Sequence, residues 1–231
     1  MRHGFRWLLV LGMLVAGLML VAPSAQAATI FDLTSCHVSA ASGPGYDCGT
    51  TQKIFGTVTL TQDGANVDFD VQLLGGNLFV ETGSANFQLF KFNGIGIVAA
   101  DIVNETTVPV LGTPLPLDGF AGSFNGDGTG NFGFGIACVT KADCNGGSGP
   151  DFSELKFTVT GATIAELTVP NNLGNVFVAD VLIASNGRTG PVDATVGVEQ
   201  HKVPEPSSLL LLGGGLVGLG LVRPLTVRRR P

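Results

Sequence analysis

The chain of 231 residues has a formal net charge of −6, and 45% of its residues are hydrophobic. The stretch from Asp32 to Glu205 holds all 18 acidic residues but only six of the 12 basic ones, which gives this part a charge of −12. Such an acidic body repels phosphate backbones and anionic lipid headgroups, so the composition argues against a nucleic-acid partner and against peripheral membrane binding.

The N-terminus has the three parts of a secretory signal peptide. Arg2 and Arg6 supply a positive end, an uncharged apolar run covers residues 7–22, and small residues follow. A retained membrane anchor is the alternative, but the run is shorter than the roughly 20 residues that span a bilayer. We therefore predict a signal helix over 1–27 that directs export through the general secretion machinery. The predicted cleavage site is formed by Ala25, Ala27 and Ala28.

The four cysteines occur as two close pairs, Cys36 with Cys48 and Cys138 with Cys144. Three pairings are possible, and the two local ones are favoured because short loops close easily outside the cytoplasm. The alternative is a metal site to which His37 could add a ligand, but neither pair has the C-x2-C spacing of a zinc knuckle.

Residues 28–202 show the period-two alternation of β-strands. The clearest example is a predicted hairpin in which residues 57–61 and 67–73 alternate between apolar and polar side chains around a turn at 63–66. The run 176–184 is apolar on both sides except for Asp180, which predicts a central strand covered on both faces. Further strands are predicted at 85–92, 131–139, 155–160 and 194–198.

Glycine and proline clusters separate these runs, at 112–116, 126–130 and 146–150, and nothing between them shows helical periodicity over twelve residues. Many short strands joined by turns predict an all-β ectodomain, a β-sandwich with a jelly-roll-like arrangement as one form of it. The expected division of the chain is a signal peptide at 1–27, the ectodomain at 28–202 and a C-terminal tail at 203–231.

One loop offers oxygen ligands for a hard cation. Oxygen-bearing side chains alternate with glycines there, which resembles part of a calcium loop, although the distal Glu of an EF-hand is missing. A simple glycine-rich turn is the alternative interpretation. The predicted ligands are Asn125, Asp127, Thr129 and Asn131.

The sequence contains no catalytic motif that we can identify. The ectodomain has only His37 and His201 as histidine bases, and G-x-S-x-G, H-E-x-x-H and phosphate-binding glycine loops are absent from the sequence. We therefore predict that the protein is not an enzyme and has no resident cofactor. A pair of carboxylates could still serve a glycosidase; Asp68 and Asp70 share a strand face, which we expect to be the solvated one.

The C-terminus combines a proline-rich stretch, an apolar run at 209–222 and a basic end. Residues 207–222 span roughly 24 Å as a helix, which makes a short transmembrane anchor against a hydrocarbon core of about 30 Å. Arginines are retained on the cytoplasmic side, so the ectodomain should lie outside. The stop-transfer residues are Arg223, Arg228, Arg229 and Arg230.

This tail resembles the sorting tail of bacterial PEP-CTERM proteins over residues 203–231. The resemblance implies recognition by a membrane processing enzyme, exosortase, cleavage near the Pro-Glu-Pro, and a Gram-negative source that makes extracellular polysaccharide. Pro224 interrupts the basic cluster that usually follows the helix directly. The matching residues of the motif are Val203, Pro204, Glu205, Pro206, Ser207 and Ser208.

From these features we expect an exported protein that is first tethered in the inner membrane and then reaches the cell surface or the extracellular matrix. Its expected role is structural or adhesive, in the envelope or in a biofilm. One alternative is a carbohydrate-binding module that recognises exopolysaccharide, although the ectodomain has few aromatic residues other than phenylalanine. The other is a glycan hydrolase that acts through carboxylates.

Overall fold

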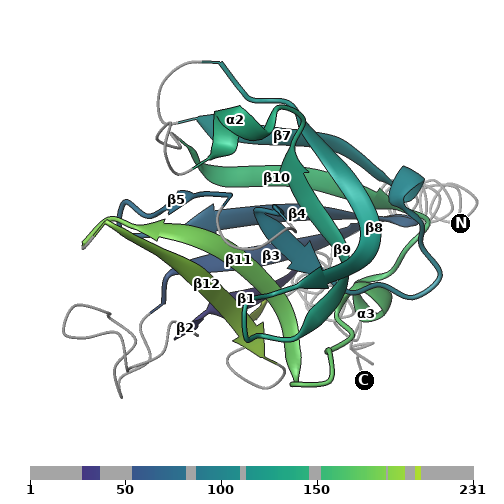
Figure 1. Cartoon of the computed structure of the whole chain (residues 1–231). Helices are drawn as coiled ribbons and strands as arrows, with labels where there is room; N and C mark the ends of the chain where they lie inside the picture. Colours follow the sequence, from purple (N-terminus) through teal and green to yellow (C-terminus); the bar gives the residue numbers. More distant parts are fainter. Residues whose placement is uncertain are drawn as a thin grey trace, which may run out of the picture. The chain divides into compact units, whose positions relative to one another are not determined.

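The computed structural model describes residues 28–36, 54–81, 87–109, 113–145, 152–185, 187–195 and 201–203. Residues Ala28–Lys202 group into one compact unit, and the segments Met1–Ala27 and Val203–Pro231 are grouped separately. Within the described residues the chain folds almost entirely as β-strands, and the helices are short: η2 at Ala99–Asp101, α2 at Lys141–Cys144 and α3 at Ile164–Leu167 (Figure 1). The prediction of an all-β ectodomain is confirmed.

The strands form two antiparallel sheets, which we call sheet A and sheet B (Figure 1). Sheet A has the order β13-β1-β3-β4-β10-β7, with β13 His201–Val203, β1 Ala28–Leu33, β3 Gly56–Asp63, β4 Asn66–Leu73, β10 Phe152–Thr160 and β7 Ile102–Pro109. Sheet B has the order β2-β12-β11-β6-β9-β8, with β2 Ser35–Cys36, β12 Arg188–Thr195, β11 Asn175–Ile183, β6 Phe90–Phe92, β9 Asn131–Cys138, β8 Leu117–Asn125, and with β5 Leu78–Phe79 also paired to β11.

The predicted hairpin is strands β3 and β4. Their register runs from Gly56 opposite Leu73 to Asp63 opposite Asn66, and a turn with Gly64 at a φ of 59° connects them. Positive φ values favour glycine, because it has no Cβ to clash. The apolar side chains of both strands are buried and the polar ones alternating with them are at least partly exposed, which places one face on the core and the other in solvent.

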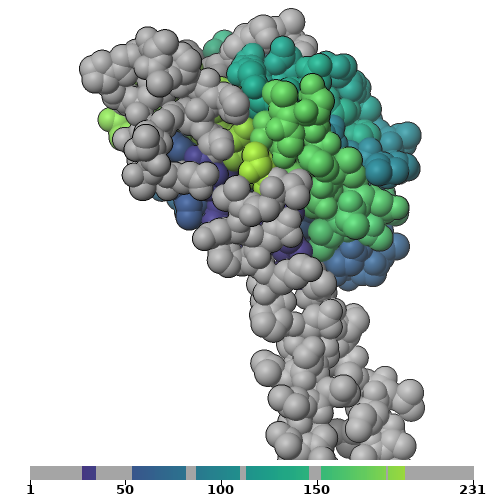
Figure 2. Space-filling model, turned by 90° about the horizontal axis from the view of Figure 1, so that it is seen from below, coloured from purple at the N-terminus to yellow at the C-terminus, as the bar shows by residue number. Residues whose placement is uncertain are grey.

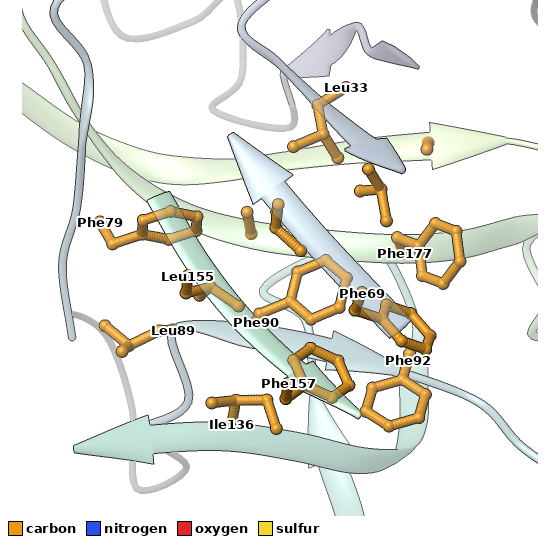
Figure 3. Packing of buried hydrophobic residues seen from close by; sticks show 14 of the residues in the cluster. Leu33, Phe69, Phe79, Leu89, Phe90, Phe92, Ile136, Leu155, Phe157 and Phe177 are labelled. Atoms are coloured by element: carbon orange, nitrogen blue, oxygen red, sulfur yellow. The ribbon is translucent and has the colours of Figure 1, made fainter. Parts of the chain in front are cut away.

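A cluster of phenylalanine rings joins the inner faces of the two sheets (Figure 3). Phe69 and Phe157 of sheet A stack with centroids 4.3 Å apart. Phe69 also meets two rings of sheet B, Phe92 at 5.3 Å and Phe177 at 6.0 Å. Such pairs contribute about 0.5–1.5 kcal/mol beyond area burial. The shared core between two antiparallel sheets is the arrangement of a β-sandwich.

Strand β11 is central, as predicted from its apolar sequence. It pairs with β12 on one side and with β5 and β6 on the other, and its residues are buried on both faces apart from one partly exposed position. Strand β9 confirms the prediction at 131–139, and β10 includes the predicted strand at 155–160.

Two predicted strands have different bounds in the structure. Of the strand expected at 85–92, the structure has Phe90–Phe92 as β6, which pairs with β11 next to the pairing of β5 with the same strand. Residues 85–86 lie outside the described residues. The strand expected at 194–198 is β12, which already begins at Arg188 and ends at Thr195, whereas 196–198 lie outside the described residues.

Strand β12 contains a proline, Pro191, whose place in the pairing with β11 explains why it fits a strand. Pro191 lies opposite Asp180 of β11. The backbone of Asp180 bonds to the other side, with its N–H donating to Leu89 and its carbonyl accepting from Val80. Pro191 therefore lies at a position of the ladder where β11 does not need a backbone N–H from β12.

The two ends of the ectodomain unit lie close together. The Thr34 N–H donates to the Asp193 carbonyl over 3.0 Å, and β2 pairs with β12. In the space-filling view, purple residues of the first strands accordingly lie near yellow-green residues from the end of the unit (Figure 2). No helix among the described residues is long and apolar enough to cross a membrane. The predicted signal helix at 1–27 and the predicted anchor at 207–222 lie outside those residues.

Candidate functional site

The sorting segment begins where the described structure ends. Val203 is the last residue of β13, and the rest of the predicted motif, Pro204 to Ser208, lies outside the described residues, as do the four predicted stop-transfer arginines. Of the predicted signal-cleavage residues only Ala28 is described, as the first residue of β1. These site residues therefore stay predictions from sequence as far as their geometry is concerned.

The predicted disulfide between Cys138 and Cys144 is present. It links the end of β9 to the end of α2, with Cα atoms 6.1 Å apart and a sequence separation of 6. In the chain-entropy account, closing so short a loop contributes about 2 kcal/mol. The side chain of Cys36, together with His37 and Cys48, lies outside the part of the chain whose side chains are described, so the second pairing stays a prediction.

A buried glutamate, Glu81, lies against this disulfide and was not predicted from the sequence. Its backbone N–H donates to the Cys144 carbonyl over 2.8 Å, and its Oε1 accepts from the Cys138 N–H over 2.9 Å. The side chain is 3% exposed, and Oε2 has no hydrogen-bond partner within the described part of the chain. A carboxylate oxygen of Glu81 and the two sulfur atoms all lie within 4.8 Å of one another.

Burial raises the pKa of Glu81 from 4.5 to about 6. The hydrogen bond from the Cys138 N–H and the positive charge of Lys141 lower the pKa of Glu81, and the negative charge of Asp180 raises it further. Because desolvation penalises the charged form, the folded protein binds a proton at Glu81 at a higher pH than the unfolded chain does.

The stability of the protein should therefore depend on pH through Glu81. The stabilisation is fully present below pH 4.5, the ordinary pKa, and is lost as the pH rises through about 6. We expect Glu81→Gln to flatten this part of the profile by about 1–2 kcal/mol. Urea unfolding at several pH values from 4 to 8 measures it, with Glu105→Gln as the control. Parallel profiles for the wild type and Glu81→Gln would contradict the assignment.

A second buried polar group is the ion pair between Lys91 and Asp180. The Lys91 ammonium lies 3.1 Å from Asp180 Oδ2, and both side chains are 1% exposed. The residues beside them in β6 and β11 point into the core, so by alternation this pair lies on the opposite face of sheet B. Burial raises the pKa of Asp180 to about 6, against the opposing effect of Lys91.

The ion pair lies where the strand next to β11 is interrupted. Between β5 and β6 the ladder is kept by Val80 and Leu89, which bond to the backbone of Asp180. Lys91 Nζ also donates to the carbonyl of Gln88 over 3.2 Å, just before β6. Lys91 thus ties the start of β6 to the central strand β11, which favours a structural role over a catalytic one.

The outer face of sheet A is polar. Lys156 of β10 lies 3.3 Å from Asp70 and 2.6 Å from Glu154, and Thr158 donates to Asp68 over 2.7 Å. The hydrogen bond that Lys156 donates to the Glu154 carboxylate is the main cause of the raised pKa of Lys156. The two aspartates lie on the solvated face, as expected, and hydroxyl and carboxylate groups are what a sugar hydroxyl can hydrogen-bond.

The predicted calcium ligands lie at the turn between β8 and β9, with Asn125 as the last residue of β8. Asn125 Oδ1 accepts from the Asp127 N–H over 2.8 Å, and the Thr129 hydroxyl donates to the Gly126 carbonyl over 2.8 Å. The Thr129 carbonyl accepts from two asparagine side chains, that of Asn171 and that of Asn175 at the start of β11 in the same sheet. These bonds define a hydrogen-bonded turn, and Asn131 follows it as the first residue of β9. Calcium binding stays a prediction.

The described structure is thus an antiparallel, disulfide-bonded β-domain with a polar outer face, and the sequence places a processing segment directly after it. Comparison with known families finds the PEP-CTERM protein-sorting motif at residues 202–223. The resemblance of the C-terminal tail to a PEP-CTERM sorting tail is therefore confirmed. A search of the curated proteins and a search of the solved structures found no match. The motif implies export and processing by a membrane-associated exosortase.

Proposed function

We propose that this chain is a structural or adhesive protein of the envelope or of the biofilm matrix, which exosortase processing delivers to the cell surface. The observation that carries the proposal is the sorting motif at 202–223. The ectodomain supports it, because a disulfide and a continuous core suit a protein that works outside the cytoplasm. In this proposal the protein acts through the contacts that its surface makes, and it catalyses no reaction.

The acidic ectodomain fits a hydrated polymer matrix. The stretch Asp32 to Glu205 carries all 18 acidic residues of the chain, so it stays soluble and repels anionic lipid surfaces once released. The exposed polar side chains of sheet A form a regular face, because those of β3, β4 and β10 lie opposite one another in the register of the three strands. Such a face suits weak, repeated contacts with a polymer.

Fractionation of the producing cells tests this proposal. Antibodies against the ectodomain should detect the processed protein in the surface or matrix fraction, and a deletion strain should form a less cohesive matrix that the wild-type chain restores. Recovery of the processed protein only from the periplasm, or a matrix of unchanged cohesion in the deletion strain, would contradict a structural or adhesive role.

The outer face of sheet A favours carbohydrate binding as a second candidate function. If this face binds exopolysaccharide, the polymer should raise the melting temperature of the wild-type protein, and Asp70→Ala should reduce that shift several-fold. Asp118→Ala, a change in the edge strand β8, serves as the control. Without any shift in the wild type, or with equal shifts in both variants, this candidate fails.

A carboxylate-based hydrolase remains the third proposal and is tested by turnover of the same polymer. If the enzyme uses Asp68 and Asp70, the amide variant at both positions should lose the activity. Asp70 already pairs with Lys156, and Asp68 accepts from Thr158, so both carboxylates have structural partners on the described face. This arrangement favours the two binding roles over hydrolysis.

A further inference from the structure

We propose that Lys91 and Asp180 form an intramolecular amide cross-link between β6 and β11, by condensation of the lysine amine with the aspartate carboxyl group. The two side chains come from neighbouring strands, and Lys91 Nζ lies 3.1 Å from Asp180 Oδ2. From this distance the nitrogen has only a short approach to make to the carboxyl carbon. The bond would join two positions that are 89 residues apart in the sequence.

The backbone holds both side chains in place for this reaction. Lys91 lies opposite Val178 of β11, so Asp180 is its diagonal neighbour on the same face of sheet B. The Asp180 N–H donates to the Leu89 carbonyl over 2.9 Å, and Lys91 Nζ donates to the Gln88 carbonyl over 3.2 Å. Reacting groups that are well oriented in one molecule reach effective concentrations of about 10⁵–10⁸ M, because little orientational entropy remains to be lost.

The surroundings of the pair exclude water. Both side chains are 1% exposed, and Val178, which lies between them on this face, is fully buried. A Cβ on Gly135, the residue opposite Lys91 in β9, would collide with the Gln88 side chain, so Gln88 packs against the strand at this point. A site without water favours a neutral product over a charged pair and protects an amide from hydrolysis.

The carboxylate of Asp180 is poorly stabilised as an ion. Its Oδ1 has no hydrogen-bond partner within the described part of the chain. Burial raises the pKa of Asp180 to about 6, against the opposing effect of Lys91, so the carboxylic acid that an amine attacks is accessible. In the amide, Oδ1 becomes a neutral carbonyl oxygen and both buried charges disappear. Condensation therefore relieves the desolvation cost that the ion pair carries.

The reaction needs no reactant beyond the two side chains. The Lys91 ammonium passes one proton to Asp180 Oδ2, which gives an amine and a carboxylic acid. The nitrogen then attacks Cγ and forms the C–N bond, a second proton moves from the nitrogen to Oδ2, and the Cγ–Oδ2 bond breaks to release water. Because the reaction can only follow folding, freshly folded chain still carries the ion pair, and measurements of that pair apply to it.

The cross-link would give the domain a covalent resistance to pulling. It would join the central strand β11 to β6 inside sheet B, so force applied to the chain could not separate these strands by breaking hydrogen bonds alone. The inference stands on the geometry of the pair and does not depend on the proposed function, although such a bond suits a structural protein of a matrix.

Mass spectrometry of the full chain, purified in a mild detergent, incubated, reduced and digested with trypsin, tests the cross-link. Trypsin cuts an unlinked chain after Lys91 and releases residues 54–91, 92–141 and 157–188 as separate peptides. Trypsin does not cut after a lysine whose amine is in an amide. We therefore expect 54–141 joined to 157–188 and lighter by one water, about 18 Da. Recovery of 54–91 and 157–188 only as separate peptides of full mass would overturn the proposal.

Lys156 is the control within the same digest. Its Nζ lies 2.6 Å from Glu154, closer than the buried pair, but its side chain is 46% exposed. We expect complete cleavage after Lys156 and no loss of water there. Loss of water at Lys156 to the same extent as at Lys91 would contradict the role assigned to burial.

Lys91→Arg is the matched variant, because it keeps a positive charge but replaces the amine by a guanidinium, which is always protonated and does not attack a carboxyl group. It should abolish the linked peptide. The linked parent keeps the segment 91–180 closed as a loop in denaturant, so after reduction it should migrate faster than Lys91→Arg on a denaturing gel. Equal mobility of the two chains, or a linked peptide in Lys91→Arg, would contradict a bond between Lys91 and Asp180.

Discussion

Pro204→Ala combined with Glu205→Ala is expected to leave the precursor uncut in the inner membrane, with loss of nearly all of the processed form. Both residues lie within the matched sorting motif at 202–223. Prolines have no N–H to donate and bias their neighbours towards extended backbone, which suits a strip of chain that a peptidase must bind. Immunoblots of membrane and matrix fractions, with an antibody against the ectodomain, measure the ratio of precursor to product.

A matched control is the double variant Glu199→Ala and Gln200→Ala, which changes the chain just before the matched residues. It should be processed like the wild type. If the Pro204 and Glu205 variant is also processed normally, the motif does not direct processing of this chain and the proposed route to the surface fails.

Lys91→Met is expected to destabilise the protein by about 3–5 kcal/mol, because it leaves Asp180 buried without its cation. Both partners are 1% exposed, so water cannot replace the lost interaction. Natural domains have a total stability of about 5–15 kcal/mol, so this single change removes a large part of it. Urea unfolding followed by circular dichroism measures the loss as a lower transition midpoint.

Two further variants separate the ion pair from other effects. Lys156→Met removes an exposed lysine whose side chain is 46% accessible, and we expect a loss of less than about 1 kcal/mol. Lys91→Met with Asp180→Leu replaces both charges by apolar groups and should recover most of the stability. Equal losses for Lys91→Met and Lys156→Met would contradict the importance of the buried pair.

The parts of the fold that could be predicted from the sequence are the strands with one buried face. β3, β4 and β10 alternate cleanly between apolar and polar residues, and β11 is apolar throughout except for Asp180 and Asn175. In these strands local sequence and tertiary burial agree, so the period-two pattern is sufficient.

The strands that sequence reasoning missed have weaker patterns. β8 contains Gly119 and Gly122 and is largely exposed as an edge strand, so its residues do not alternate between buried and exposed. β7 is interrupted by Asn104, whose φ is 59°, and its pairing with β10 shifts register. β1 follows the predicted signal peptide directly, and its pairing with β3 is a long-range contact that its own sequence does not reveal.

The buried polar groups were only partly predictable. Cys138 and Cys144 are close in sequence, so their pairing followed from the short loop. Glu81 is 57 residues from Cys138, and Lys91 is 89 residues from Asp180, so only the fold brings them together. One signal was present: a lone aspartate in an apolar central strand requires a buried partner.

The intact mass of the native protein, taken from the producing cells, tests the account most directly. Export and sorting predict a polypeptide that begins at Ala28, ends near Pro204 to Pro206 and contains a disulfide between Cys138 and Cys144. The unprocessed chain has a mass of 23.7 kDa. Finding that full mass, with the cysteines reduced, as the only form in the cells would contradict both the export and the processing of this protein.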